Sequence, residues 1–150
     1  MAKTLIRHAV AADFGDLLEI DQTSFECGVA YDAAELSYFI HRDESETLVL
    51  EEDNQVVAFL ILEVHPNRRA GTIVTLDVRE GYRRNGYGTQ LMDRAEDILM
   101  KYGVEVYDLQ VDVGNRPAIN FYKKHGFRTV RTLCRYYANG NDAFLMVKEL

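Results

Sequence analysis

Apolar residues recur along this chain with two different periods, and the alternation between them predicts its secondary structure. Spacings of three and four residues, which place apolar side chains on one face of a helix, occur in segments 13–24, 32–41, 86–102 and 116–125. Alternating or short apolar runs bounded by turn residues, which are typical of strands, occur in segments 5–7, 46–50, 56–64, 71–78, 104–113, 127–136 and 143–148. The resulting order, βααβββαβαββ, predicts an α+β domain with a mixed, mostly antiparallel sheet.

Residues that begin and end helices support these boundaries. Asp32, with Glu35 three residues later, forms a capping-box pattern at the start of the second helix. Gly103 follows the third helical segment, where a glycine commonly ends a helix. Pro117 lies in the first turn of the fourth helix and Gly126 follows its end.

A basic, glycine-containing turn, Arg-Arg-Asn-Gly-Tyr-Gly-Thr at residues 83–89, joins strand 71–78 to the third helix. Unpaired N–H groups at a helix start and the helix dipole both favour an anion there. Gly86 and Gly88 allow a ligand to approach the backbone closely, and Arg83 and Arg84 can add charge-assisted hydrogen bonds. The segment therefore predicts a phosphate site.

Two common nucleotide sites do not fit this turn. The dinucleotide fingerprint G-x-G-x-x-G lacks its third glycine, because Thr-Gln-Leu follows Gly88. A P-loop needs Lys and then Ser or Thr after its last glycine, and Thr-Gln stands there instead. What remains is an R-x-x-G-x-G pattern that begins at Arg83.

Composition narrows the classes of function. The 150 residues, 47% of them hydrophobic, predict one domain over residues 1–150 with a sizeable core. No apolar run reaches the length of a membrane span, and the N-terminus lacks the apolar segment of a signal peptide. The net charge of −7 argues against a nucleic-acid partner and suits cationic or amine-bearing substrates.

Cysteines and histidines do not predict a metal site or a disulfide framework. Cys27 and Cys134 lie far apart without a C-x-x-C pattern, and the four histidines lack metal-ligand spacing. A reducing cytoplasm is therefore the expected location.

The R-x-x-G-x-G turn resembles the pyrophosphate-binding motif of the GNAT superfamily, the acyl-CoA-dependent N-acetyltransferases. Two further segments resemble the same family: Leu-Asp-Val at 76–78, before the turn, and N-x-x-A-x-x-F-Y-x-x-x-G-F, which starts at Asn115. The ending Arg-Tyr-Tyr-Ala-Asn-Gly-Asn-Asp-Ala at 135–143 resembles RimI-like and related N-terminal acetyltransferases. The resemblance covers the whole chain and implies the GNAT fold, with acetyl-CoA as the donor and no metal.

The resemblance also implies where the donor binds. The backbone amides of the turn hold the pyrophosphate, the strand end at 76–78 pairs with pantetheine, and an N–H near Val78 polarises the thioester oxygen. Asn115 is either a second contact, the N-cap of the helix that carries Pro117, or both. The predicted donor-binding residues are Leu76, Val78, Arg83, Arg84, Asn85, Gly86, Tyr87, Gly88, Thr89, Asn115 and Tyr122.

Tyr122 is the predicted general acid, because it matches the tyrosine of the family motif. A phenol with a pKa of about 10 is protonated at pH 7 and can donate to the departing CoA thiolate. The alternative interpretation is a core aromatic residue that packs beside Phe121.

At the position of the general base, this sequence departs from the family pattern. RimI-like enzymes carry a glutamate where this chain has Gln110, which cannot take a proton. A water held by Gln110 or by the backbone is one alternative. Another is a nearby carboxylate: Asp112, on the same strand face as Gln110, or Asp77, or Glu63. Each carboxylate can equally be a solvated strand charge.

The missing glutamate bears on the acceptor. An α-amine, with a pKa of about 7.7–8.0, is partly neutral at pH 7, whereas a lysine amine, at about 10.4, is almost wholly charged. A weak base therefore favours an N-terminal α-amine as the acceptor. By resemblance, Phe25, Val29 and Tyr31 in the loop after the first helix form apolar walls for a peptide, with Tyr136 and Tyr137 on the other side.

Two other functions stay open. An acetyltransferase for a small amine, such as a polyamine, an amino acid or an antibiotic, suits the acidic charge equally well. A non-catalytic acyl-CoA-binding module would account for Gln110 in place of the glutamate. The acyl chain and the oligomeric state, monomer or homodimer, are left open.

Overall fold

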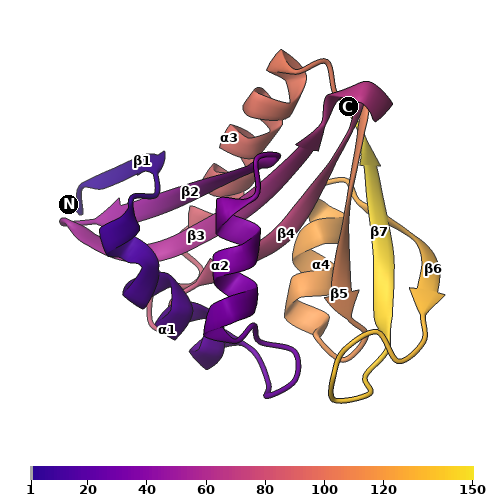
Figure 1. Ribbon diagram of the computed structural model, residues 1–150, viewed down its shortest axis with the longest axis horizontal. Coiled ribbons are helices and arrows are strands. Elements are labelled where there is room, and N and C mark those ends of the chain that lie inside the picture. The colour runs from indigo at the N-terminus through magenta and orange to yellow at the C-terminus, as the bar shows by residue number, and fades with distance from the viewer. Residues whose placement is uncertain (1) are drawn as a thin grey trace.

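The computed structural model describes residues 2–150, and its strands form one seven-stranded sheet in the order β1-β2-β3-β4-β5-β7-β6 (Figure 1). Every neighbouring pair in this sheet is antiparallel except β4 and β5, which are parallel. The predicted fold class and element order are confirmed. The strands are β1 (Thr4–His8), β2 (Ser45–Glu52), β3 (Gln55–His65), β4 (Ala70–Val78), β5 (Val106–Asp112), β6 (Arg128–Leu133) and β7 (Ala143–Glu149).

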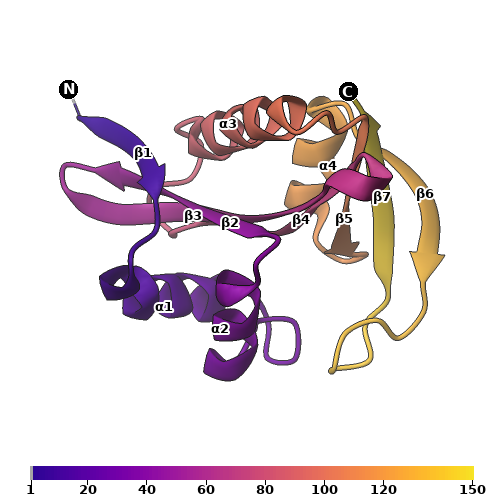
Figure 2. The same ribbon diagram turned by 45° about the horizontal axis from the view of Figure 1, so that its top comes forward.

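Four α-helices cover the two faces of the sheet. They are α1 (Phe14–Ser24), α2 (Ala33–His41), α3 (Tyr87–Lys101) and α4 (Arg116–Lys124), with short 3₁₀ turns at Ala11–Asp13 and Pro66–Arg68. Figure 2 shows α1 and α2 on one face, and α3 and α4 on the other. None of the helices in residues 2–150 is both long and apolar enough to span a membrane.

Strand β3 is buried on both of its faces, because its side chains contribute to the core under each pair of helices. Residues 56–64 are all buried, and all of them except Glu63 are apolar. Such a nearly continuous apolar run is typical of a strand buried on both sides. Phe59 and Ile61 pack with Leu17, Ile20 and other residues beneath α1 and α2. The larger core lies beneath α3 and α4.

The caps agree with the local sequence signals. The Asp32 side chain accepts a hydrogen bond from the Glu35 backbone N–H at 2.8 Å, and Glu35 Oε1 accepts one from the Asp32 N–H at 3.1 Å. Gly103, with φ at +73°, follows the end of α3 in the left-handed region that glycine tolerates.

The end of β6 differs from its prediction. The strand stops at Leu133 rather than continuing to residue 136. Arg135 adopts a left-handed backbone with φ at +52°, and its N–H donates to Asp142 Oδ1 at 2.9 Å instead of to a strand. Tyr136 and Tyr137 therefore lie in the loop between β6 and β7.

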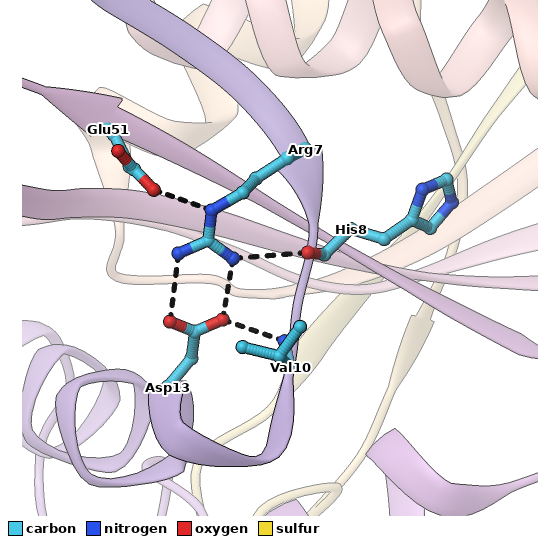
Figure 3. Close-up of polar contacts among 5 residues, drawn as sticks. All are labelled: Arg7, His8, Val10, Asp13 and Glu51. Carbon is cyan, nitrogen blue, oxygen red and sulfur yellow. Dashed lines mark hydrogen bonds and ion pairs between the residues drawn. The ribbon is translucent and has the colours of Figure 1, made fainter. Parts of the chain in front are cut away.

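An ion pair fixes the start of α1 against β1. The Arg7 guanidinium donates two hydrogen bonds to Asp13, at 2.8 and 3.0 Å, and Asp13 also accepts from the Val10 N–H at 2.8 Å (Figure 3). Glu51 of β2 accepts a further bond from Arg7 Nε. This contact sets the direction in which α1 leaves the sheet, and so where its far end lies.

Strands β4 and β5 separate soon after they start. Within the described chain they pair only over residues 70–72 and 106–108. Figure 1 shows the two strands together near their N-terminal ends and apart at their C-terminal ends. The remaining edges of both strands consequently border an opening in the sheet.

Candidate active site

A cavity of about 680 Å³ occupies the opening between β4 and β5. Its walls include residues from both faces of the sheet: Leu76 and Val78 pack on the α3–α4 side, whereas Asp21 and Tyr31 belong to the α1–α2 side. A ligand in this cavity can therefore reach from one face of the sheet to the other.

The turn at residues 83–89 forms one end of the cavity. Arg84 and Gly86 have φ values of +66° and +79°, and this bend brings the chain into the start of α3. No side chain in the part of the chain that the structure describes caps this helix start. Its first backbone N–H groups are thus available to an anion, as the sequence predicts for a phosphate site.

Gly88 has a packing role that the motif alone does not reveal. A β-carbon at this position would lie 3.3 Å from the ring of Phe121 on α4. Glycine therefore allows α3 and α4 to approach each other closely beside the cavity. Gly86, in contrast, has open space around it and is required by its positive φ.

Two polar side chains of the turn stabilise it from within. Arg83 Nε donates to the carbonyl of Val78 at 3.0 Å, so the turn is tied to the end of β4. Asn85 Nδ2 donates to the carbonyl of Tyr82 at 3.0 Å, and Asn85 is not among the residues that line the cavity. The Asn85 side chain thus shapes the turn.

Asn115 is the N-cap of α4. Its Oδ1 accepts a hydrogen bond from the Ala118 N–H at 3.3 Å, and Asn115 also lines the cavity. The capping role is therefore observed, and a contact with the donor stays a prediction.

Tyr122 projects from α4 into the region between the two ends of the cavity. Its ring is 8% exposed, lines the cavity, and lies edge-on to Phe121 and Phe127 at centroid distances of 5.3 and 5.7 Å. Burial, and then the nearby Asp77 carboxyl, raise the pKa of Tyr122. The phenol is therefore held in the protonated form that a general acid requires.

On β5, alternate residues face opposite sides of the sheet. Leu109 and Val111 are buried in the core under α3 and α4, so Gln110 and Asp112 face the other side, and both line the cavity. Asp112 already accepts two hydrogen bonds at 2.8 Å, from the Gly114 N–H and from Asn141 Nδ2. The Asp112 carboxylate thus organises two loops and has limited capacity as a base.

Glu63 lies away from the cavity. It is paired with Arg42 at 3.1 Å and stands near the C-terminal end of β3, and it does not line the opening. Glu63 therefore fits the alternative interpretation, a structural charge on a strand. This charge is buried and paired, whereas the sequence suggested a solvated one.

The loop of residues 25–31 and the β6–β7 loop meet on the α1–α2 side. Phe25, Val29, Tyr31 and Tyr137 line the cavity. Tyr136 does not: its ring is 48% exposed and lies edge-on to Tyr137 at 4.9 Å. Its predicted contact with substrate has no support from the position of its side chain.

The remaining predicted site residues converge on the same cavity. Of the predicted set, those that line it are Phe25, Val29, Tyr31, Leu76, Asp77, Val78, Arg83, Arg84, Gly86, Tyr87, Gly88, Thr89, Gln110, Asp112, Asn115, Tyr122 and Tyr137. Within residues 2–150, no group of three or more His, Cys, Asp or Glu side chains is arranged to hold a metal ion.

Comparison with known proteins establishes the family. The model of the acetyltransferase (GNAT) family matches residues 14–127, which include β4, the turn, α3, β5 and α4. The chain belongs to this family. The predictions of a GNAT fold and of an acetyl-CoA-dependent acetyltransferase are confirmed.

Several relatives resemble this acetyltransferase over much of its length. It is 34% identical to the N-alpha-acetyltransferase of Sulfurisphaera tokodaii, in an alignment that covers 97% of this chain and 92% of that protein. It is 43% identical to the N-alpha-acetyltransferase of Sulfolobus acidocaldarius over 83 residues, 55% of this chain and 49% of that one. The crystal structure of Ard1 from Thermoplasma volcanium superposes with a TM-score of 0.89 at 27% identity, covering 98% and 97% of the two chains. The narrower RimI-like assignment stays a prediction.

The acetyltransferase contains one cavity residue that sequence reasoning missed. Asp21 is fully buried on the inner face of α1, one turn after Leu17, and lines the cavity beside Asp77 of β4. The signal was present, because a carboxylate at a core-facing helical position is rarely buried without a partner. Only the fold brings that partner, a second carboxyl, next to it.

Proposed function

We propose that this acetyltransferase transfers the acetyl group of acetyl-CoA to the N-terminal α-amine of a peptide or protein. The observation that carries the proposal is the cavity that passes between β4 and β5, since it joins a phosphate-binding turn on one face to a loop-lined entrance on the other. The names of the relatives, N-alpha-acetyltransferases from Sulfurisphaera tokodaii and Sulfolobus acidocaldarius, support the same acceptor.

The donor fits the α3–α4 side of the cavity. The uncapped start of α3 and the side chains of Arg83 and Arg84 would hold the pyrophosphate. The edge of β4 at residues 73–78, which β5 does not pair, leaves backbone groups for the pantetheine amides. Together these contacts would hold the thioester near Val78 and Tyr122, which both line the cavity.

The acceptor would enter from the α1–α2 side. Phe25, Val29 and Tyr31 form one wall there and Tyr137 forms the other. In a complex of both substrates, the neutral amine attacks the thioester carbonyl directly, the C–S bond breaks, and Tyr122 protonates the leaving thiolate. Holding both substrates in one cavity removes much of the entropic cost of bringing them together.

A small cationic amine is the second candidate acceptor, and one observation is compatible with it. Two buried carboxyl groups, Asp21 and Asp77, line the cavity, and negative charge attracts any ammonium group. This feature serves an α-ammonium group equally well, so it does not separate the two acceptors. Both candidate acceptors are compatible with the predicted cytoplasmic location and with either a monomer or a homodimer.

The test is a mass-spectrometric screen with acetyl-CoA and a mixed library of peptides, polyamines and free amino acids. We expect acetylation at peptide α-amines, located by fragment ions, and none at lysine side chains of peptides whose N-termini are blocked. Acetylated polyamines or amino acids alone would instead support the small-amine candidate. Binding of CoA without any product would indicate a non-catalytic module.

A further inference from the structure

Two carboxyl groups, those of Asp21 and Asp77, meet inside the cavity. Asp21 projects from α1 and is 0% exposed, and Asp77 projects from β4 and is 2% exposed. Thr75 and Asp77 are paired across the sheet with Ile61 and Phe59, which pack under α1 and α2, so both face the acceptor side. Asp77 thus lies one residue from Val78 but on the opposite face.

The hydrogen bonds of the pair leave one oxygen of each carboxyl without a partner. Asp21 Oδ2 accepts from the Tyr31 N–H at 2.8 Å, and Asp77 Oδ1 accepts from the Thr75 hydroxyl at 2.6 Å. Asp21 Oδ1 and Asp77 Oδ2 are buried and have no hydrogen-bond partner in the described chain. A single proton held between the two carboxyls would satisfy both oxygens.

The surroundings favour such a shared proton. Burial, and then the adjacent Asp21 carboxyl, hold the pKa of Asp77 well above its ordinary range, and the Thr75 hydroxyl and Arg83 offset this only in part. Two like charges in contact in a buried site cannot both remain ionised at little cost. The phenols of Tyr31 and Tyr122 face the pair, and burial raises the pKa of each. Asp112 and Tyr137 are further titratable residues that line the same cavity.

We propose that the Asp21–Asp77 pair binds the amine of the acceptor and takes its proton, in the role that Gln110 cannot fill. The inference rests on the proposed function for the identity of the amine. In the complex, one proton is held in common by the amine nitrogen and the two carboxyls. With that proton on nitrogen, an ammonium ion faces two carboxylates; with it on the pair, the nitrogen is neutral and attacks.

The acetyl transfer that follows returns Tyr122 to its starting protonation state. The neutral nitrogen forms a bond to the thioester carbon, and the collapse of the tetrahedral intermediate breaks the C–S bond with the electron pair on sulfur. Tyr122 gives its proton to the thiolate, and the excess proton on the new amide nitrogen restores the phenol. The pair keeps the proton that it took from the amine, which is its resting state, and the next ammonium ion to bind displaces that proton to solvent.

The pair suits this role better than the other carboxyl groups that the sequence suggests as bases. Both oxygens of Asp112 already accept hydrogen bonds, and Glu63 lies outside the cavity. A proton acceptor works best when its pKa lies near that of the group it deprotonates, which for an α-ammonium is about 7.7–8.0. A lone solvated aspartate, at about 3.9, is far too weak a base, whereas a buried pair is a stronger one.

The test compares Asp77→Asn and Asp21→Asn with wild type on the best amine found in the acceptor screen. In wild type, we expect kcat to be nearly independent of pH from about pH 7 to 9. In Asp77→Asn, we expect kcat at pH 7 to fall about 100-fold and to rise with pH up to the pKa of the substrate ammonium. The KM for acetyl-CoA should stay within about threefold.

Asp108→Asn is the matched control. Asp108 is a half-buried carboxyl that accepts from a threonine hydroxyl, Thr72, at 2.7 Å, much as Asp77 accepts from Thr75, but it does not line the cavity. It should keep the wild-type dependence of kcat on pH. A pH profile of Asp77→Asn parallel to that of wild type would overturn the proposal and assign the pair a structural role.

A second measurement does not depend on the variants being active. In wild-type protein with carbon-13-labelled aspartate, one carboxyl resonance should titrate well above the ordinary value of about 3.9, and Asp21→Asn should move it. If every aspartate titrates near or below that value, the pair holds no proton and the proposal fails. A wild type that acetylates only non-peptide amines would contradict the proposed function, whereas the pH and titration experiments would still test the pair.

Discussion

Gly28 lies against Asn139, and this contact joins the two loops on the acceptor side of the cavity. A β-carbon on Gly28 would stand 2.7 Å from Asn139 Cβ and 2.8 Å from its backbone nitrogen. The neighbouring Ala138 N–H donates to the Gly28 carbonyl at 3.1 Å. Figures 1 and 2 show the α1–α2 loop and the β6–β7 loop close together. Their spacing is thus set by a position that only glycine can occupy.

Gly28→Ala should separate these loops. The substitution adds a clash with backbone to the strain of a positive φ, +89°, which alone costs about 1–2 kcal/mol. We expect a loss of about 2–3 kcal/mol in the free energy of unfolding and a KM for peptide that rises about tenfold as the walls move. The KM for acetyl-CoA, whose proposed site lies on the other side of the cavity, should change little. Urea denaturation and steady-state kinetics measure these quantities.

Gly140→Ala separates strain from the clash. Gly140 lies in the β6–β7 loop with φ at +88°, and open space surrounds the position of its missing β-carbon. It should lose only about 1–2 kcal/mol and keep the wild-type KM for peptide. If the two variants have the same KM, contact between the loops does not set the width of the acceptor entrance.

Gly88→Ala should weaken binding of acetyl-CoA through Phe121. Its β-carbon would lie 3.3 Å from the Phe121 ring, so either this ring or α3 must shift by a few tenths of an ångström. Since the start of α3 follows the proposed phosphate-binding turn, we expect the Kd for CoA, measured by calorimetry, to rise about tenfold. The double variant with Phe121→Leu should recover part of this affinity. Weakening that persists in the double variant would point to the backbone and not to the ring.

The turn and the helix start that form the proposed donor half of the site could be recognised in the sequence because their determinants are local. Gly86, Gly88 and Arg83 lie within six residues of one another, and the helix start that they precede is itself a local signal. Asn115 was likewise recognisable as a cap from its position before Pro117. The strand and helix order follows from periodicity for the same reason.

The acceptor half depends on contacts between distant segments, which periodicity does not encode. Asp21 looks like a polar residue within an amphipathic helix until the fold places it beside Asp77, 56 positions later. The separation of β4 from β5 after residue 72 is equally invisible in the apolar pattern of either strand. Arg135 gives no sign in the sequence of the left-handed backbone that it adopts two residues after the end of β6.

Tyr122→Phe should reduce turnover without releasing the donor. The ring keeps its edge-on packing against Phe121 and Phe127, so the fold and the CoA site should be unaffected. Loss of the phenolic proton removes the general acid, and kcat should fall about 100- to 1,000-fold. Stopped-flow kinetics with a thiol reagent measures the release of CoA. Full turnover in this variant would show that the thiolate leaves unprotonated or takes its proton from solvent.

The pH profile should show no loss of activity from Tyr122 below about pH 10. Burial, and then the Asp77 carboxyl, raise the pKa of Tyr122 above its ordinary value of about 10, so the folded state holds this proton more tightly than the unfolded state. The stability that follows is fully present below about pH 10 and is lost as the pH rises above it. Ultraviolet absorbance of wild type and of Tyr122→Phe would follow tyrosine ionisation. A titration below about pH 10 that disappears in Tyr122→Phe would contradict this assignment.

The Arg7–Asp13 ion pair should make the free energy of unfolding depend on pH in the acidic range. Two hydrogen bonds from Arg7, opposed in part by burial, lower the pKa of Asp13 below its ordinary value of about 3.8. A lowered pKa contributes stability that is fully present above about pH 4 and is lost as the pH falls through the pKa of the folded state. Asp13→Asn should therefore lose about 2–3 kcal/mol at pH 7, because it leaves the Arg7 charge with one partner fewer.

The difference between Asp13→Asn and wild type should shrink below about pH 3, where the wild-type carboxyl is also protonated. Asp16→Asn is the control: it removes a nearby acidic side chain of α1 that is exposed and makes no ion pair among the described residues, and it should cost less than about 0.5 kcal/mol. Urea unfolding at pH 7 and pH 3 measures both. A cost for Asp13→Asn that is equal at the two pH values would mean that the pair contributes by shape and hydrogen bonding, and not through its charge.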